Sequence, residues 1–164
     1  MNEQQTVLLA DDDESLRRVV EYNLREDGYE VLTAADGRTA LQRFQESHVD
    51  LVLTDVRMPE MTGFELLTHL KTMQPDLPVI VLTAHGTIDA AVEAMKAGAF
   101  DYLTKPFSRD QLQATVRKAL ELGALASENR QLRQIVRERF SFANMIAGSR
   151  AMRGVTDTAS RVAA

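Results

Sequence analysis

The run Thr6-Val-Leu-Leu-Ala10 is short and almost wholly apolar, and three aspartates, Asp11, Asp12 and Asp13, follow it directly. Such a run is typical of a strand that is covered on both faces of a sheet. Similar runs return four times further along the chain, at residues 29–34, 49–54, 79–83 and 100–104. The sequence therefore predicts five buried strands.

The segments between these runs have the apolar spacing of amphipathic helices. Leu16, Val19, Val20 and Leu24 recur at helical intervals after the first run. The expected helices cover residues 15–27, 63–73 and 87–97, another opens at Asp36-Gly37, and a fifth begins at Ser108. Strands that alternate with helices over short connections indicate an α/β fold with a parallel sheet. We expect the flavodoxin-like strand order 2-1-3-4-5.

Composition excludes several classes of protein. The chain has 164 residues, 45% hydrophobic and 26% charged, which is enough for one folded domain with an appendage. The absence of cysteine excludes disulfides, thiol catalysis and Cys-ligated zinc, and it fits a cytoplasmic location. No apolar run approaches the length of a membrane span, and the start of the chain is polar, so no membrane association is predicted.

Charge divides the chain into two parts. Residues 1–120 hold 12 Lys and Arg against 20 Asp and Glu, and residues 121–164 hold 7 against 4. An acidic body of net charge −8 argues against nucleic acid as a direct ligand.

Reactive side chains follow four of the five predicted strands. In a parallel sheet, ligands bind beyond the carboxyl ends of the strands. Clustered carboxylates repel one another unless a cation joins them, and Mg²⁺ suits an open site with few oxygen ligands. A carboxylate, a metal ion, an ammonium group and a hydroxyl together favour phosphoryl transfer. The strand-end residues are Asp11, Asp12, Asp55, Thr83 and Lys105, and Lys105-Pro106 is a candidate cis peptide.

Four stretches carry a resemblance to the receiver domain of two-component response regulators. They are Val7-Leu-Leu-Ala-Asp-Asp-Asp-Glu, Asp50-Leu-Val-Leu-Thr-Asp-Val-Arg-Met-Pro-Glu-Met-Thr-Gly, Pro78-Val-Ile-Val-Leu-Thr-Ala and Gly98-Ala-Phe-Asp-Tyr-Leu-Thr-Lys-Pro-Phe. The resemblance covers residues 4–122. It implies a cytoplasmic signalling domain that accepts a phosphoryl group from a sensor histidine kinase. Such a domain catalyses only its own phosphorylation and dephosphorylation and is not an enzyme with a free substrate.

The resemblance also implies a role for each residue of the site. Asp55 would be the phosphoacceptor. Asp12, Asp55 and the backbone carbonyl of Arg57 would bind Mg²⁺, and Asp11 would act through a water molecule. Lys105 would pair with the phosphoryl group. Thr83 would hydrogen-bond to it and, with Tyr102, form the conformational switch.

The segment Thr87-Ile-Asp-Ala-Ala-Val-Glu-Ala-Met-Lys-Ala-Gly-Ala-Phe-Asp-Tyr resembles the receivers of nitrogen-regulatory activators that work with sigma-54 RNA polymerase. The resemblance implies that the longer protein carries an ATPase domain as a further partner. Residues 143–164 resemble the beginning of that AAA+ ATPase domain, without its phosphate-binding loop.

The segment that follows the receiver-like part predicts a dimer. Leu125, Asn129, Leu132 and Val136 follow the 4-3-4 spacing of a coiled-coil seam, with Asn129 at an a position. We expect the fifth helix to continue from Leu112 to Phe140, with residues 123–142 as a linker. A homodimer is expected to form through the fifth helix and this linker. A single helix folded back on the body is the alternative.

Two other functions stay open from the sequence. Asp11-x-Asp13-x-Ser15 matches the DxDx[TS] signature of haloacid-dehalogenase phosphatases, in which Asp11 would be the nucleophile. A flavodoxin-like cofactor binder is the second alternative, although four acidic residues after the first strand would repel a phosphate group.

Overall fold

A computed structural model describes residues 3–152 of the chain, and side chains as far as residue 146. The chain divides into two units, residues 1–124 and residues 125–164. The first unit holds a five-stranded parallel sheet of order β2-β1-β3-β4-β5, as predicted. The strands are β1 (Thr6–Ala10), β2 (Glu30–Ala34), β3 (Leu51–Asp55), β4 (Val79–Thr83) and β5 (Asp101–Thr104).

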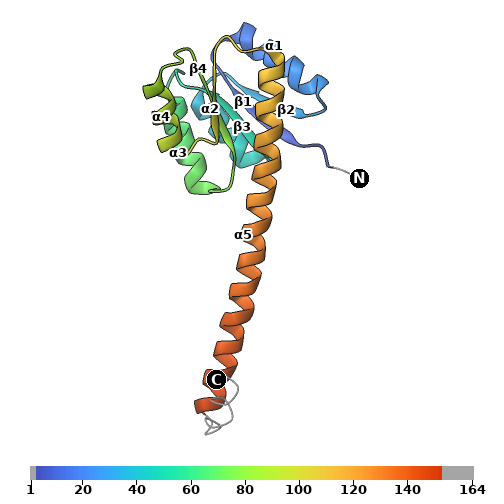
Figure 1. Ribbon diagram of the computed structural model, residues 1–164, viewed down its shortest axis with the longest axis vertical. Helices are drawn as coiled ribbons and strands as arrows, with labels where there is room; N and C mark the ends of the chain where they lie inside the picture. Colours follow the sequence, from blue (N-terminus) through green and yellow to red (C-terminus); the bar gives the residue numbers. More distant parts are fainter. Residues whose placement is uncertain (1–2, 153–164) are drawn as a thin grey trace. The chain divides into compact units, whose positions relative to one another are not determined.

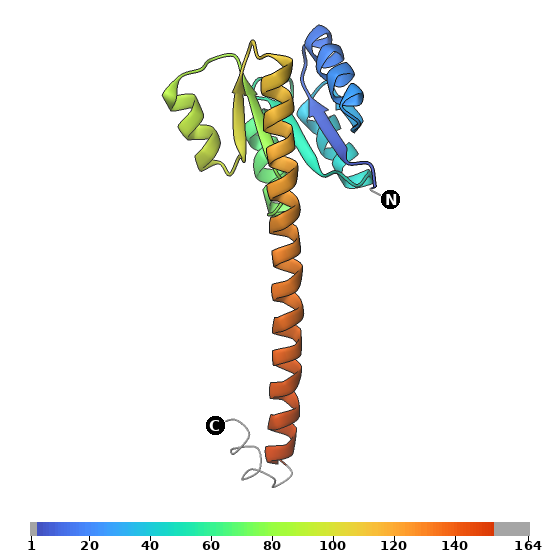
Figure 2. The same cartoon turned by 45° about the vertical axis from the view of Figure 1, so that its right-hand side comes forward.

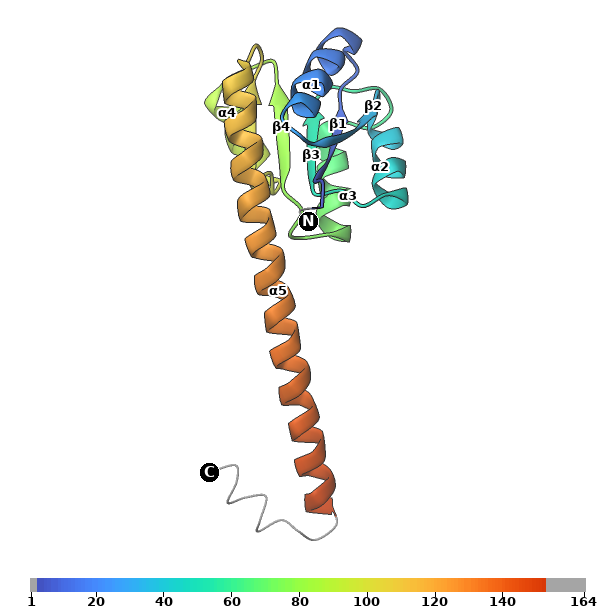
Figure 3. The ribbon, with the colours of Figure 1, turned by 90° about the vertical axis from the view of Figure 1, so that its right-hand side faces the viewer.

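Helices cover both faces of the sheet (Figure 1). The helices are α1 (Glu14–Glu26), α2 (Gly37–Glu46), α3 (Gly63–Met73), α4 (Ile88–Lys96) and α5 (Arg109–Met152). The core residues of α2, α3 and α4 pack on one face, and those of α1 and of α5 up to Leu120 pack on the other. Figure 2 gives a second view of these layers, and Figure 3 shows α2 and α3 side by side.

Alternation along the central strands builds both layers of the core. In β1, Leu8 packs toward the α2, α3 and α4 layer, whereas Val7 and Leu9 pack toward α1 and α5. All three side chains are completely buried. Burial of each contributes roughly 1.5–3 kcal/mol, so the continuous apolar runs of the sequence are explained by a sheet with no solvent face.

The helices begin at side-chain caps that the sequence already contains. Asp13 Oδ1 accepts from the Leu16 N–H, and Thr87 Oγ1 accepts from the Ala90 N–H. Thr62 and Glu65 form a reciprocal capping box at the start of α3. Gly98, with φ +100°, follows α4 in the left-handed conformation that ends many helices.

The fifth helix is longer than the sequence predicted. α5 continues to Met152 instead of ending at Phe140. In the second unit the side chains of the predicted seam are all exposed, with Leu125 at 61%, Leu132 at 56% and Val136 at 65%. The predicted ATPase segment at 143–164 lies partly outside the described residues, since 153–164 are not described. Within the described part, no helix combines the length and the apolar character needed to cross a bilayer.

Candidate functional site

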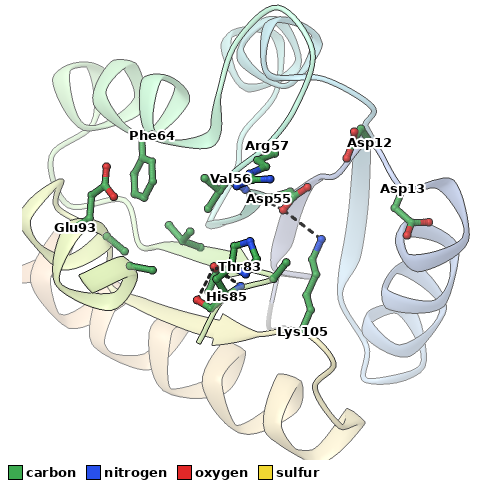
Figure 4. A pocket seen from close by; sticks show the side chains of 14 residues that line it. Asp12, Asp13, Asp55, Val56, Arg57, Phe64, Thr83, His85, Glu93 and Lys105 are labelled. Carbon is green, nitrogen blue, oxygen red and sulfur yellow. Dashed lines mark hydrogen bonds and ion pairs between the residues drawn. The ribbon is translucent and has the colours of Figure 1, made fainter. Parts of the chain in front are cut away.

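The register of the sheet brings the predicted site residues to one edge. Ala10 of β1 pairs with Thr54, Asp55 of β3 pairs with Leu82, and Thr83 of β4 pairs with Thr104. The strand ends therefore lie level with one another. A pocket of about 510 Å³ opens there, and Figure 4 shows that the side chains of Asp12, Asp55, Thr83 and Lys105 lie around it.

Lys105 joins two of the carboxylates. Its Nζ lies 2.9 Å from Asp11 Oδ2 and 3.2 Å from Asp55 Oδ1. The Lys105-Pro106 bond is cis, as predicted. The Lys105 side chain is 19% exposed, and that of Asp11 is 1% exposed. Because this contact is shielded from water, the Coulomb attraction between the two charges is stronger than in a surface ion pair, although burial of both groups offsets part of it.

Three carboxylates are close enough to share one cation. Asp11, Asp12 and Asp55 each offer an oxygen, and these oxygens lie within 4.8 Å of one another. Asp11 and Asp55 are buried, whereas Asp12 is exposed. A set of oxygen donors that is open to water on one side fits Mg²⁺, which keeps several of its waters. The cluster that the sequence predicted is therefore present with suitable ligand chemistry.

The electrostatics of Asp55 and Lys105 reflect this crowding. Burial raises the pKa of Asp55, the Asp11 carboxylate raises it further, and Lys105 offsets part of the effect. For Lys105, burial lowers the pKa, but hydrogen bonds and charges from Asp11 and Asp55 outweigh burial and raise it. Asp55 is thus held where its negative charge is unfavourable, and a cation would relieve this.

The backbone of Asp55 is fixed by a close approach from α3. Gly63 packs so tightly on Asp55 that a Cβ at residue 63 would clash with the Asp55 carbonyl oxygen. The Gly63 N–H also donates to the Val56 carbonyl at 2.8 Å, and the Val56 N–H donates to Asp55 Oδ1 at 2.9 Å. Only glycine fits this contact, a role that the sequence pattern did not reveal.

Thr83 and Arg57 line the pocket, whereas Tyr102 lies outside its lining. The Thr83 hydroxyl donates to the His85 carbonyl at 3.1 Å, so it is engaged with the β4–α4 loop (Figure 4). Arg57 lines the pocket beside Asp55. Tyr102 is partly buried against the core on the α2, α3 and α4 side and does not line this pocket.

Replacement of Asp55 by Asn is expected to stabilise the protein at neutral pH. The raised pKa means that the folded state favours protonated Asp55. Protonated Asp55 therefore contributes to folding stability at a pH below its ordinary pKa, and this contribution is lost as the pH rises through the raised pKa of the folded state. In EDTA, Asp55→Asn should melt at a higher temperature than wild type at pH 7, and the difference should vanish near pH 3. Thermal unfolding across this pH range measures it. A lower melting temperature for the variant at pH 7 would contradict this electrostatic account.

Comparison with known proteins agrees with the geometry. Residues 7–117 match the family described as response regulator receiver domain. Regulatory protein AtoC of Escherichia coli is 36% identical over 157 residues, which are 96% of this chain and 34% of AtoC. DctD, a C4-dicarboxylate transport transcriptional regulatory protein of Pseudomonas aeruginosa, is 41% identical over 88% of this chain and 31% of its own length. The chain thus spans about a third of these relatives.

Solved structures have the same fold. NtrX from Brucella abortus superposes with a TM-score of 0.75 at 33% identity, over 79% of this chain and 30% of NtrX. A receiver domain protein from Clostridium thermocellum superposes with a TM-score of 0.70 at 36% identity, over 74% of this chain and 98% of its own. The family match covers most of the first unit, and the chain belongs to the response regulator receiver domain family.

Proposed function

We propose that the first unit accepts a phosphoryl group on Asp55 from the phosphohistidine of a sensor histidine kinase. The observation that carries this proposal is the bridge that Lys105 makes between Asp11 and Asp55 at the mouth of the pocket. In the reaction, an Asp55 oxygen would bond to phosphorus, the bond between phosphorus and the histidine nitrogen would break, and the imidazole would leave with that electron pair.

Each residue of the site has a task in this reaction. Asp12, Asp55 and the Arg57 carbonyl would hold Mg²⁺, with Asp11 acting through a water. The ion, when bound, supplies positive charge that offsets the charge of the phosphoryl oxygens. Lys105 would pair with one phosphoryl oxygen, and the Thr83 hydroxyl would turn from His85 to donate to another. Tyr102 would then reorient with Thr83 and shift the conformational population of the domain.

The position of Asp11 argues against the phosphatase alternative. Its side chain is 1% exposed, and its two oxygens accept hydrogen bonds from Lys105 and from the Asp13 N–H. A nucleophile must reach its substrate, and Asp55, at 12% side-chain exposure, lies on the pocket wall. Of these two carboxylates, Asp55 is the more accessible, and it is the nucleophile in the proposed receiver reaction.

We also propose that the longer protein is a sigma-54-dependent transcriptional activator. The similar proteins AtoC and DctD are named as regulatory proteins and are about three times as long as this chain. In this proposal the receiver and a homodimeric linker control an ATPase domain, while this fragment binds no DNA. The cytoplasmic location predicted from the sequence belongs to the same proposal.

Phosphorylation is expected to require the divalent cation, and the conformational response to phosphorylation is expected to require Lys105. Purified protein with acetyl phosphate and Mg²⁺ should gain the mass of one phosphoryl group, and EDTA should prevent this. Lys105→Ala should still bind Mg²⁺ because the carboxylates remain, but conformational transmission should be poor. Intact-protein mass spectrometry measures labelling. Hydrogen exchange of β5 and α4 measures the conformational change that phosphorylation causes. Labelling that persists in EDTA would contradict the metal requirement.

A further inference from the structure

A ring of three hydrogen bonds holds the β1–α1 loop, and Arg17 closes it. Arg17 Nη1 donates to the backbone carbonyl of Asp11 at 2.7 Å. The Arg17 N–H donates to the Asp13 carbonyl at 2.9 Å, and the Asp13 N–H donates to Asp11 Oδ1 at 2.9 Å. Asp12 lies in the chain between the two aspartates of this ring. The ring therefore restrains the loop that carries two of the three clustered carboxylates.

Arg17 has no role in the proposed phosphoryl transfer, yet its side chain binds the backbone of Asp11. The other polar groups of Asp11 are bound by the sheet, the loop and Lys105: its N–H donates to the Ala34 carbonyl at 3.1 Å, and its carboxylate accepts from Asp13 and Lys105. The guanidinium of Arg17 contacts the backbone carbonyl of Asp11, and the Asp11 carboxylate oxygens bind Asp13 and Lys105 instead. The positive charge of Arg17 thus lies beside the acidic cluster without forming an ion pair with the Asp11 carboxylate.

We propose that Arg17 is a positioning residue for the magnesium site, and that it sets the affinity for the ion by fixing the loop from Asp11 to Asp13. This inference rests on the proposed metal-dependent function. Without the Arg17 bond, repulsion among carboxylates within 4.8 Å of one another would favour loop conformations that separate them. Residues that orient ligands without touching the metal typically contribute 10- to 100-fold to affinity.

The charge of Arg17 and its hydrogen bond have opposite effects on metal binding. Loss of a positive charge near an acidic site strengthens the attraction of Mg²⁺ to that site. Loss of the restraint weakens binding, because the ion must then order the loop itself. The direction of the change in affinity therefore separates positioning from a simple charge effect.

Arg18 provides a matched control on the same helix turn. Its guanidinium pairs with Glu14, and its side chain is 76% exposed. Arg18→Ala removes the same charge and side-chain type one residue away, without touching Asp11. Isothermal titration with Mg²⁺ should give a dissociation constant about tenfold higher for Arg17→Ala than for wild type. The constant for Arg18→Ala should be unchanged or slightly lower, and Arg17→Lys should fall between Arg17→Ala and wild type.

Thermal unfolding in EDTA and with added Mg²⁺ supplies a second measure, since the stabilisation by the ion depends on its affinity. If Arg17→Ala does not fold, the pair Arg17→Lys and Arg18→Lys decides, with weaker Mg²⁺ binding expected in the first alone. Equal or tighter Mg²⁺ binding by the folded Arg17 variants would overturn the proposal while leaving the proposed function in place. A wild-type protein that binds no Mg²⁺ would overturn both.

Discussion

Asp55→Asn is expected to lower phosphoryl labelling by acetyl phosphate at least 100-fold, to the background of the assay. The amide is a poor nucleophile and cannot form the acyl phosphate, so the loss follows from the chemistry of one side chain. The fold should survive, because Asn can still accept from the Val56 N–H as Asp55 Oδ1 does. Intact-protein mass spectrometry after a timed reaction with Mg²⁺ gives the labelled fraction.

Asp13→Asn is the matched control for this loss. Asp13 lines the same pocket but is not one of the three clustered carboxylates, and its side chain caps α1. Asn caps a helix about as well as Asp, so the loop should keep its structure. Labelling near the wild-type level is expected. Equal loss in both variants would indicate general damage to the acidic loop and would argue against Asp55 as the acceptor.

Leu132→Glu is expected to convert the proposed homodimer into a monomer. Leu132 is 56% exposed in the second unit and holds a d position of the seam with Leu125, Asn129 and Val136. In a dimer, two glutamates would face each other in an apolar seam, where burial of unpaired charge is strongly unfavourable. Sedimentation velocity at micromolar concentration measures the change.

Ile135→Glu tests whether this seam is the correct face. Ile135 is 46% exposed and holds a g position in the same register, beside the seam and not within it. The same chemical change there should leave the dimer intact. Dissociation by Ile135→Glu with no effect of Leu132→Glu would place the interface on another face of the helix, and a wild-type monomer would remove the dimer proposal.

The architecture was predictable because alternation of buried strands and amphipathic helices constrains a chain strongly. The exact first and last residues of the strands were less predictable. Residues 49–54 were predicted as the third strand, whereas β3 is Leu51–Asp55. Asp50 belongs to the preceding turn, where its carboxylate accepts from the Thr6 N–H at 2.8 Å. The helix end at Met152 was also not predicted, because the fifth helix was expected to end at Phe140.

The cluster of Asp11, Asp12, Asp55 and Lys105 was predictable from a rule of geometry, since parallel strands end at the same edge of the sheet. Arg17 and Gly63 were not predicted as parts of the site. An arginine on an amphipathic helix has the sequence signature of a solvent-exposed charge, and the contact of Gly63 with the Asp55 backbone depends on how α3 packs. Supporting residues of this kind follow from tertiary contacts that periodicity does not encode.

The most direct test is to map the phosphorylated residue itself. Protein phosphorylated by its cognate kinase or by acetyl phosphate would be trapped with borohydride, which reduces an aspartyl phosphate to homoserine, and then sequenced by tandem mass spectrometry. The proposed function predicts homoserine at position 55. Homoserine at position 11, or at any position other than 55, would contradict it.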